Sequence, residues 1–301
     1  MKPSRLCFGS LTLSPLQKNL SVEDGVRLLL HAYNQGVNFY DTAELYDNYP
    51  VFMAFLKKVP REQVIISTKC YAYSRETAEE SLTKALVEMD TSYVDYFLLH
   101  EQESVHTLRG HAEAIDYFLE QREKGLIKKF GISTHHISGV KAAARDQRIE
   151  VLHPIINKAG IGIVDGTRDE MIEAIREAKK TGKFIYAMKA LGGGHLLKDY
   201  REALSFVLDL DFLDSIAIGM QSIEEIDQNI ESFKGTISDV AIHATRRLHI
   251  AEWCIGCGNC VERCQQNAMT LKDNKAVVDH HRCVLCSYCV STCPDFCIKV
   301  I

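Results

Sequence analysis

The chain has 301 residues, of which 46% are hydrophobic and 25% charged, and its formal net charge at pH 7 is -5. This length allows one large domain and a small one, and the mild charge excludes a basic surface for nucleic acid or an anionic membrane. No apolar run reaches the roughly 18 residues of a membrane span, and residues 1–14 lack a secretory signal, so we expect a soluble cytoplasmic protein.

From residue 4 to about residue 232, short apolar runs alternate with longer amphipathic stretches. Short apolar runs without a two-residue alternation are typical of strands that are buried on both faces. We expect such strands at Val64–Thr68, Val94–Leu99, Lys129–Ser133, Phe184–Leu191 and Ser215–Gly219.

The stretches between these runs carry helical patterns. Apolar residues recur three and four positions apart, which marks one face of a helix, at Leu82, Ala85, Leu86 and Met89, and at Ile115, Phe118 and Leu119 before Gly125. The stretch Asp169–Lys180 begins with acidic residues, ends with basic residues and stops before Gly182. This order suits the helix dipole and a glycine C-cap.

The repeating unit is one strand followed by one helix. Strands are expected to start near residues 5, 37, 64, 94, 128, 151, 184 and 215. This spacing predicts an α/β fold, a closed parallel (β/α)8 TIM barrel over residues 1–235. An open doubly wound sheet is the alternative, but no G-x-G-x-x-G motif follows any strand.

The remaining residues form a connection and a tail. Residues 236–251 are expected to connect the two parts, with a helix from Asp239 to His249. Residues 252–301 contain eight of the 11 cysteines, in two copies of C-x2-C-x2-C-x3-C that are offset by 29 residues. This is the spacing of bacterial ferredoxins with two [4Fe–4S] clusters, so we expect a small α+β dicluster ferredoxin-like domain.

In such domains the fourth cysteine of each run ligates the other cluster. We therefore expect one cluster at Cys254, Cys257, Cys260 and Cys293, and the second at Cys283, Cys286, Cys289 and Cys264. Zinc is a weaker alternative, because each run crowds three thiolates into one short loop. Disulfides are also weaker, because a cytosolic chain keeps its thiols reduced. Cys7, Cys70 and Cys297 are expected to be small buried residues.

Polar residues follow the expected strands at the end where barrels build their active sites. Asp41 and Tyr46 follow the second strand, Lys69 the third and His100 the fourth. Tyrosine has an ordinary pKa of about 10, and a neighbouring ammonium would move that pKa towards neutrality while a carboxylate holds the lysine in place. The histidine could orient a carbonyl oxygen.

Three motifs around these residues resemble the aldo-keto reductase family: GVNFYDTAELYDN at 36–48, STK at 67–69 and LLH at 98–100. Asp41, Tyr46, Lys69 and His100 match its catalytic tetrad. GIST at 131–134, PIIN at 154–157 and MKALGGG at 188–194 are similar to the branch with a C-terminal ferredoxin module. The resemblance implies hydride transfer between a nicotinamide and a small carbonyl or alcohol substrate, with Tyr46 as general acid. It also implies cofactor contacts from Ser133 and Asn157.

Glycines near the ends of the last two strands predict a phosphate site, since barrels often bind phosphate there at a helix N-terminus. The alternative is that these glycines only turn the chain. Lys189, late in the seventh strand, would face a cofactor phosphate, a substrate carboxylate or a partner carboxylate. Further candidates for the cofactor site are Gly192, Gly193, Gly219, Gln221, Ser222, Glu225 and Asn229.

The nucleotide itself is left open. The family usually places a basic residue after the eighth strand to hold the 2′-phosphate, but here Glu224, Glu225 and Asp227 follow and the next basic residue is Lys234. Carboxylates without a cation disfavour a phosphate, so NADH is at least as well supported as NADPH, or the nucleotide site is lost. A flavin also stays open, because hydride carries two electrons and a cluster carries one.

Three functions follow. The first is a nicotinamide-dependent carbonyl reductase or alcohol dehydrogenase whose clusters exchange single electrons with a ferredoxin or flavoprotein partner. The second is a nicotinamide-independent reductase that receives electrons one at a time through its clusters. The third is a non-catalytic iron–sulfur redox sensor, against which the intact tetrad argues.

Overall fold

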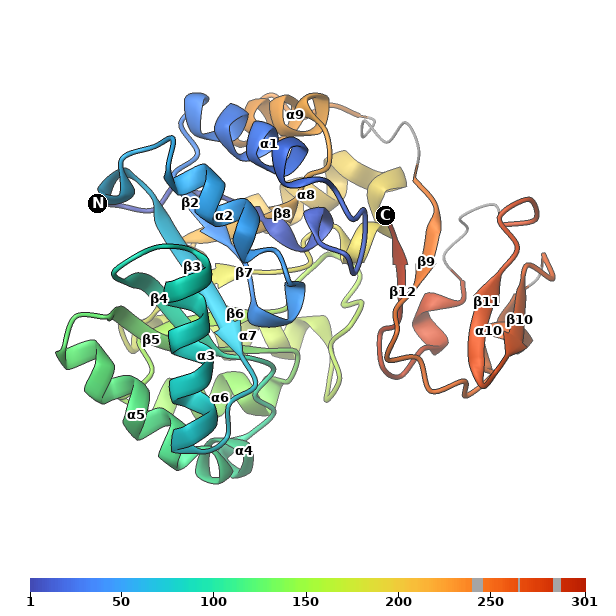
Figure 1. Cartoon of the computed structure of the whole chain (residues 1–301). Coiled ribbons are helices and arrows are strands. Elements are labelled where there is room, and N and C mark those ends of the chain that lie inside the picture. Colours follow the sequence, from blue (N-terminus) through green and yellow to red (C-terminus); the bar gives the residue numbers. More distant parts are fainter. Residues whose placement is uncertain (240–245, 265, 284–287) are drawn as a thin grey trace.

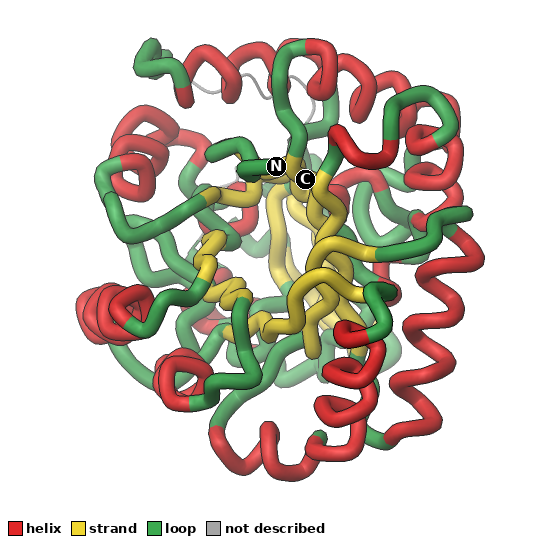
Figure 2. The backbone as a smooth tube through the Cα atoms, turned by 90° about the vertical axis from the view of Figure 1, so that its left-hand side faces the viewer, coloured by secondary structure: helices red, strands yellow, loops and turns green. Residues whose placement is uncertain are grey.

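In the computed structural model, residues 1–239, 246–264, 266–283 and 288–301 are described. Eight parallel strands close into a barrel, in which β1 pairs with both β2 and β8. Figure 2 looks into this ring of strands, which the helices surround. The strands are β1 (Leu6–Gly9), β2 (Phe39–Asp41), β3 (Ile65–Cys70), β4 (Val94–Leu99), β5 (Ile127–Thr134), β6 (Val151–Pro154), β7 (Phe184–Ala187) and β8 (Ser215–Gly219).

Helices connect successive strands and cover the outside of the barrel (Figure 1). The two helices expected from their apolar patterns are confirmed as α3 and α5, and the helix expected from its charge order is confirmed as α7. The helices are α1 (Val22–Asn34), α2 (Tyr49–Leu56), α3 (Arg75–Glu88), α4 (Val105–Gly110), α5 (Ala112–Glu123), α6 (Ile137–Arg145), α7 (Arg168–Lys180), α8 (Tyr200–Leu208) and α9 (Ile223–Phe233). Helix α7 starts with a capping box in which the Thr167 side chain accepts from the Glu170 backbone N–H, which satisfies an otherwise free donor.

The barrel interior is filled beneath the site. A buried cluster there contains Cys7, Phe39, Ile65, Tyr96, Leu98, Val151 and Tyr186. Because strand side chains alternate between the two faces, Phe39 and Asp41 of β2 point the same way, with Asp41 nearer the carboxyl end. The packed interior therefore closes the barrel below Asp41 and leaves the carboxyl ends of the strands for chemistry.

The seventh strand is shorter than expected. Strand β7 ends at Ala187 instead of Leu191, and only Met188 continues it, through a single bridge to Ile155. Lys189 then takes a left-handed conformation with a φ of 60°, which no strand accommodates. Lys189 thus lies in the loop after β7, which continues into the 3-10 turn η4 (Gly192–Gly194).

The tail forms two small antiparallel sheets. Strands β10 (Met269–Lys272) and β11 (Lys275–Val278) make one sheet, and β9 (Leu248–Ile250) and β12 (Ile298–Val300) make the other. The helix α10 (Asn259–Arg263) and the 3-10 turn η6 (Val290–Thr292) carry cysteine loops. The helix expected from Asp239 to His249 falls partly on residues 240–245, which lie outside the described residues. Its end is wrong, because His249 belongs to β9 and pairs with Lys299.

The tail packs against the barrel through β12 (Figure 1). The His195 Nε2 atom lies 3.0 Å from the Ile298 carbonyl oxygen. The Phe296 ring packs closely on this loop, since a Cβ atom added to Gly193 would lie 3.2 Å from its Cζ atom. The strand that ends the cysteine module is therefore fixed beside the loop after β7. In the described part of the chain no helix is long and apolar enough to cross a membrane.

Gly194 offers a test of this contact. It has a φ of +92°, and an added Cβ atom would lie 2.2 Å from the Val300 carbonyl oxygen. We expect Gly194→Ala to lower the free energy of unfolding in urea by about 1–3 kcal/mol more than a matched control, because overpacking forces backbone shifts. The control is Gly235→Ala, where φ is +105° and nothing lies within 4 Å. Equal losses in the two variants would contradict the packing of β12 against this loop.

Candidate active site and cluster domain

The base of the site is a buried ion pair between neighbouring strands. The Lys69 Nζ atom of β3 donates to Asp41 Oδ2 at 2.8 Å and to the Thr42 carbonyl oxygen at 2.7 Å. The two charged side chains are only 1% and 6% exposed. The hydroxyl of Tyr186 donates to the other carboxylate oxygen of Asp41 at 2.8 Å. Since a buried charge needs a partner, this network fixes the ammonium in one place.

Tyr46 and His100 lie above this pair. Tyr46 ends the 3-10 turn η2 (Glu44–Tyr46), and the Lys69 Nζ atom lies 5.0 Å from its ring centroid. His100 directly follows β4, and its ring centroid is 6.1 Å from that of Tyr46, at an interplanar angle of 75°. The structure thus brings the four tetrad candidates together. The Nδ1 atom of His100 is buried and has no hydrogen-bond partner among the described residues, so it is available to a ligand.

The expected lowering of the Tyr46 pKa is wrong. Burial, with the negative charges of Asp41 and Glu101, raises the pKa of Tyr46 well above its ordinary value. The reason is geometric: the Lys69 ammonium bonds to Asp41 and Thr42 and faces the ring of Tyr46. Burial and the positive charge of Lys69 lower the pKa of His100 well below its ordinary value. At neutral pH Tyr46 is therefore a protonated phenol, and His100 is an uncharged imidazole.

Four further residues support the site and were missed in the sequence. Tyr186 hydrogen-bonds to Ser67 at 2.8 Å and stacks on His153, with ring centroids 3.8 Å apart. Tyr71 stacks on the ring of His100, with centroids 4.6 Å apart. The sequence indicates their role only weakly. Tyr186 and His153 carry polar atoms inside short apolar strands, where a purely structural role is the ordinary explanation.

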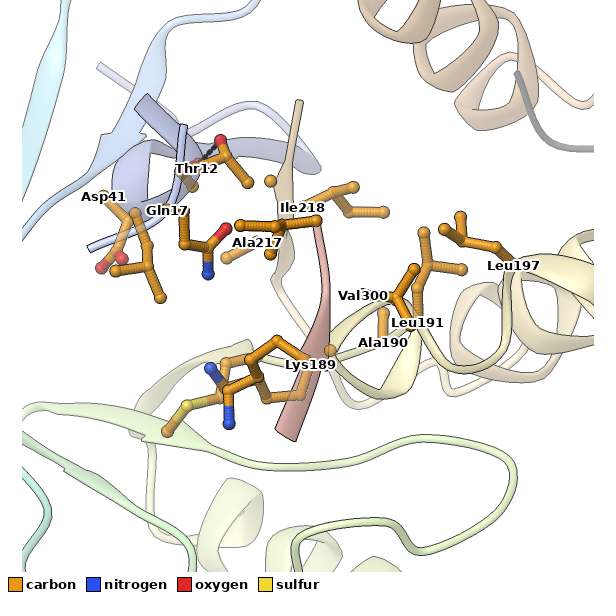
Figure 3. A pocket seen from close by; sticks show the side chains of 18 of the residues that line it. Thr12, Gln17, Asp41, Lys189, Ala190, Leu191, Leu197, Ala217, Ile218 and Val300 are labelled. Carbon is orange, nitrogen blue, oxygen red and sulfur yellow. Dashed lines mark hydrogen bonds between the residues drawn. The ribbon is translucent and has the colours of Figure 1, made fainter. Parts of the chain in front are cut away.

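A cavity opens at the carboxyl ends of the strands (Figure 3). It contains about 830 Å³ of empty space, counting the part that is open to solvent. Asp41 and Tyr46 line one part, and the loop after β7 contributes Lys189 and Gly193. The tail contributes Lys299, Val300 and Ile301 to the wall. The cavity, named here the catalytic cavity, is therefore built by both parts of the chain.

The candidates for cofactor contacts separate into two groups. Lys189, Gly193 and Gly219 line the catalytic cavity. The others do not line it, and several are engaged within the protein. The Oγ atom of Ser133 accepts from the Glu101 N–H at 2.9 Å, and the Asn157 side chain bonds to both backbone groups of Ile161 at 2.9 and 3.0 Å. Outside the lining of the cavity lie Ser133, Asn157, Gly192, Gln221, Ser222, Glu225 and Asn229.

The region after β8 contains a basic residue that the local sequence concealed. Arg246 lines the catalytic cavity, and its Nη2 atom lies 2.6 Å from Glu225 Oε1. Both side chains are only 10% exposed. The Arg246 Nε and Gln221 Nε2 atoms are buried donors without a partner among the described residues. The expectation that this region lacks a cation is therefore wrong. The folded chain brings in Arg246, which lies 21 residues after Glu225 in the sequence.

The cysteines of the first expected cluster line a second cavity, named here the cluster cavity. Its lining contains Cys254, Cys257, Cys260 and Cys293, together with Cys297. Burial, and then the negative charges of Cys254, Cys293 and Cys257, raise the pKa of the Cys260 thiol. No set of three or more His, Cys, Asp or Glu in the described ranges is arranged for a single metal ion. Four thiols around one space are instead the donor set of a [4Fe–4S] cluster.

Backbone amides point at cysteine sulfurs in both halves of the repeat. The Cys293 Sγ atom accepts from the Cys297 N–H at 3.2 Å, and the Cys264 Sγ atom accepts from the Ala268 N–H at 3.3 Å. Both bonds span four residues, as an internal repeat requires. Hydrogen bonds to the sulfurs tune cluster potentials. For the second cluster Cys264, Cys283 and Cys289 are described, whereas Cys286 lies outside the described residues.

One strand separates the two cavities. Ile298 of β12 lines the cluster cavity, whereas Lys299 and Val300 of the same strand line the catalytic cavity. Neighbouring side chains of a strand point to opposite faces, which accounts for Ile298 and Lys299. Val300 ends β12 and borders the catalytic cavity as well. A cluster at Cys254, Cys257, Cys260 and Cys293 would lie one strand away from the catalytic cavity.

Comparisons with known proteins agree with both parts of this description. The Aldo/keto reductase family model matches residues 5–202, and a 4Fe-4S dicluster domain model matches residues 253–297. L-galactose dehydrogenase from Arabidopsis thaliana is 22% identical over 271 residues, covering 76% of this chain and 84% of that protein. Probable aldo-keto reductase 1 from Glycine max is 28% identical over 192 residues, covering 54% of each chain.

Solved structures show the same barrel. A putative aldo-keto reductase from Pseudomonas aeruginosa superposes with a TM-score of 0.66 at 19% identity, covering 77% of this chain and 90% of that one. An aldo-keto reductase from Bacillus halodurans in its holo form gives a TM-score of 0.65 at 20% identity, covering 78% and 88%. At these identities the likeness establishes the fold of the barrel.

Proposed function

Because the chain belongs to the aldo/keto reductase family and also carries a 4Fe-4S dicluster domain, we propose that it interconverts a small carbonyl compound and its alcohol in the catalytic cavity. The observation that carries this proposal is the arrangement of Tyr46 and His100 above the buried Asp41–Lys69 pair. A protonated phenol, an uncharged imidazole and a fixed ammonium are the groups that this reaction needs. A redox sensor would need none of them.

The residues of the chain account for the proton chemistry. Reduction of a carbonyl to an alcohol takes two electrons and two protons, here divided into a hydride for the carbon and a proton for the oxygen. Tyr46 gives its proton to the carbonyl oxygen, and His100 orients that oxygen through a hydrogen bond. The Lys69 ammonium, held by Asp41, then stabilises the phenolate that Tyr46 has become.

The hydride is proposed to come from a nicotinamide, which supplies it when bound. Arg246 supports this assignment, because its guanidinium lines the cavity and its unpartnered Nε donor could bind a nucleotide phosphate. The clusters, when bound, exchange one electron at a time. In this arrangement the tail passes single electrons to or from a ferredoxin or a flavoprotein, and a flavoprotein can combine two single electrons into a hydride equivalent.

The position of β12 favours a second candidate, a reductase without nicotinamide. A cluster in the cluster cavity would lie beside Ile298, whose strand neighbour Lys299 lines the catalytic cavity. The internal hydrogen bonds of Ser133 and Asn157 also leave these side chains satisfied without a nucleotide. In this candidate two single electrons and two protons reach the substrate separately, and Tyr46 supplies one of the protons.

Nucleotide titration of the anaerobically purified protein distinguishes the two candidates. We expect NADH or NADPH to bind, and Arg246→Met to weaken that binding by about 10–100-fold, which is the loss of one charge-assisted hydrogen bond. The control is Lys234→Met, because Lys234 is an exposed lysine that pairs with Glu231 on the surface of α9. Absence of binding by either nucleotide to the wild-type protein would overturn the first candidate and leave the second.

A further inference from the structure

Two lysines from different parts of the chain face the catalytic cavity. Lys189 lies in the loop after β7, and Lys299 lies on β12 of the tail. Lys189 is partly buried, and Lys299 is only 5% exposed. They meet around one aromatic ring: their Nζ atoms lie 5.7 and 3.5 Å from the ring centroid of Phe296.

Neither ammonium is paired with an acid in the described part of the chain. The Lys299 Nζ atom donates to the Phe296 carbonyl oxygen, and the Lys189 Nζ atom has no hydrogen bond or ion pair there. The acidic side chains whose charges act on Lys189 are Glu101 and Asp41. Asp41 is committed to Lys69, whereas Glu101 is exposed and accepts from Tyr71.

Burial and the positive charge of Lys189 lower the pKa of Lys299, against the negative charges of Cys297, Cys293 and Glu101. His100 and His135 lie within the field of these lysines, and burial together with the positive charges of Lys189 and Lys299 lowers the pKa of His135 well below its ordinary value. Burying like charges without a counter-charge is unfavourable. An anion that enters the cavity would remove this cost, because it gives both ammonium groups a partner.

We propose that Lys189 and Lys299 form a subsite for an anionic group of the substrate, a carboxylate or a phosphate, while its carbonyl lies at Tyr46 and His100. This rests on the proposed function, since it names the class of carbonyl compound that the tetrad reduces: an oxo acid or a phosphorylated carbonyl compound. Lysine suits this role because its ammonium is a compact point charge with three donors. Lys299 also makes the subsite depend on the tail, so a barrel without the tail would lack half of it.

Matched substrates test the subsite. We expect kcat/KM to be at least about tenfold higher for the anionic member of one substrate pair. If the subsite binds a carboxylate, 2-oxobutanoate is favoured over butanone. If it binds a phosphate, glyceraldehyde 3-phosphate is favoured over glyceraldehyde. In Lys189→Met and Lys299→Met the anionic substrate is expected to lose about 10–100-fold in kcat/KM, and the neutral substrate is expected to lose much less. The control is Lys198→Met, an exposed lysine of the same loop.

Calorimetry supplies a readout that does not depend on turnover. Oxalate and inorganic phosphate are the probes; the wild-type protein should bind at least one of them, and both lysine variants should lose that binding. Lys299→Arg keeps the charge and should retain it, which separates loss of the cation from misfolding of the tail. Equal losses for neutral and anionic substrates, or unchanged anion binding in both Met variants, would overturn the subsite. If no carbonyl is reduced but the anion still binds through the two lysines, the proposed function fails and the subsite stands.

Discussion

Replacing Tyr46 with Phe is expected to lower kcat for carbonyl reduction by about 10²–10⁴, the usual contribution of a positioned general acid. The substitution removes one oxygen and keeps the ring that faces Lys69 and His100. Burial holds the pKa of Tyr46 above its ordinary value, so the phenol carries its proton throughout the neutral range. The measurement is anaerobic steady-state reduction of a carbonyl substrate, with iron content determined in parallel.

Tyr71→Phe is the matched control for this variant. Tyr71 also borders His100, on which its ring stacks, but its hydroxyl donates to the exposed Glu101 at 2.8 Å. Loss of that hydroxyl should change kcat by no more than about threefold, because one exposed hydrogen bond contributes little. Turnover that survives in Tyr46→Phe and falls in Tyr71→Phe would transfer the role of proton donor to Tyr71. Both variants should retain their clusters, since neither side chain belongs to the tail.

The elements that could be predicted from the sequence are those whose structure depends on nearby residues alone. The buried strands of the barrel are mostly apolar, a pattern that is visible without knowing the neighbours, as at Val94–Leu99, where Asp95 is the one charged residue. Helix α7 likewise carries its own start signal at Thr167. The errors occur where a distant contact decides. The segment around His249 was expected to be helical but pairs as a strand with Lys299, 50 residues later, and that pairing overrides local preference.

The same distinction applies to the site. Asp41, Tyr46, Lys69 and His100 could be located because a barrel collects the ends of successive strands at one edge. Arg246 could not, since its contact with Glu225 depends on how the connection after α9 returns to the barrel. The Tyr46 pKa was misjudged for a related reason: proximity to Lys69 was foreseeable, but the direction of the ammonium towards Asp41 and Thr42 was not.

Cys293→Ala is expected to remove one cluster, so that the purified protein contains about four iron atoms in place of eight. Cys293 lines the cluster cavity with the three cysteines of the first run, although the sequence places it at the end of the second. The variant therefore tests the exchange of ligands between the two halves. Iron and acid-labile sulfide per chain, with the electron paramagnetic resonance spectrum of the reduced protein, give the number of clusters that remain.

Cys297→Ala is the control, because Cys297 lines the same cavity, is only 2% exposed and lies outside both cysteine runs. It should keep both clusters. Equal loss of iron in the two variants would show that this cavity tolerates no substitution, and would not identify Cys293 as a ligand.

Cys293 also stands five residues before Ile298, in the segment that continues into β12. Because β12 forms one wall of the catalytic cavity, loss of this cluster should weaken binding of oxalate or phosphate at Lys299 as well. Loss of the second cluster through Cys283→Ala should leave that binding closer to wild type, since Cys283 does not line the cluster cavity beside β12.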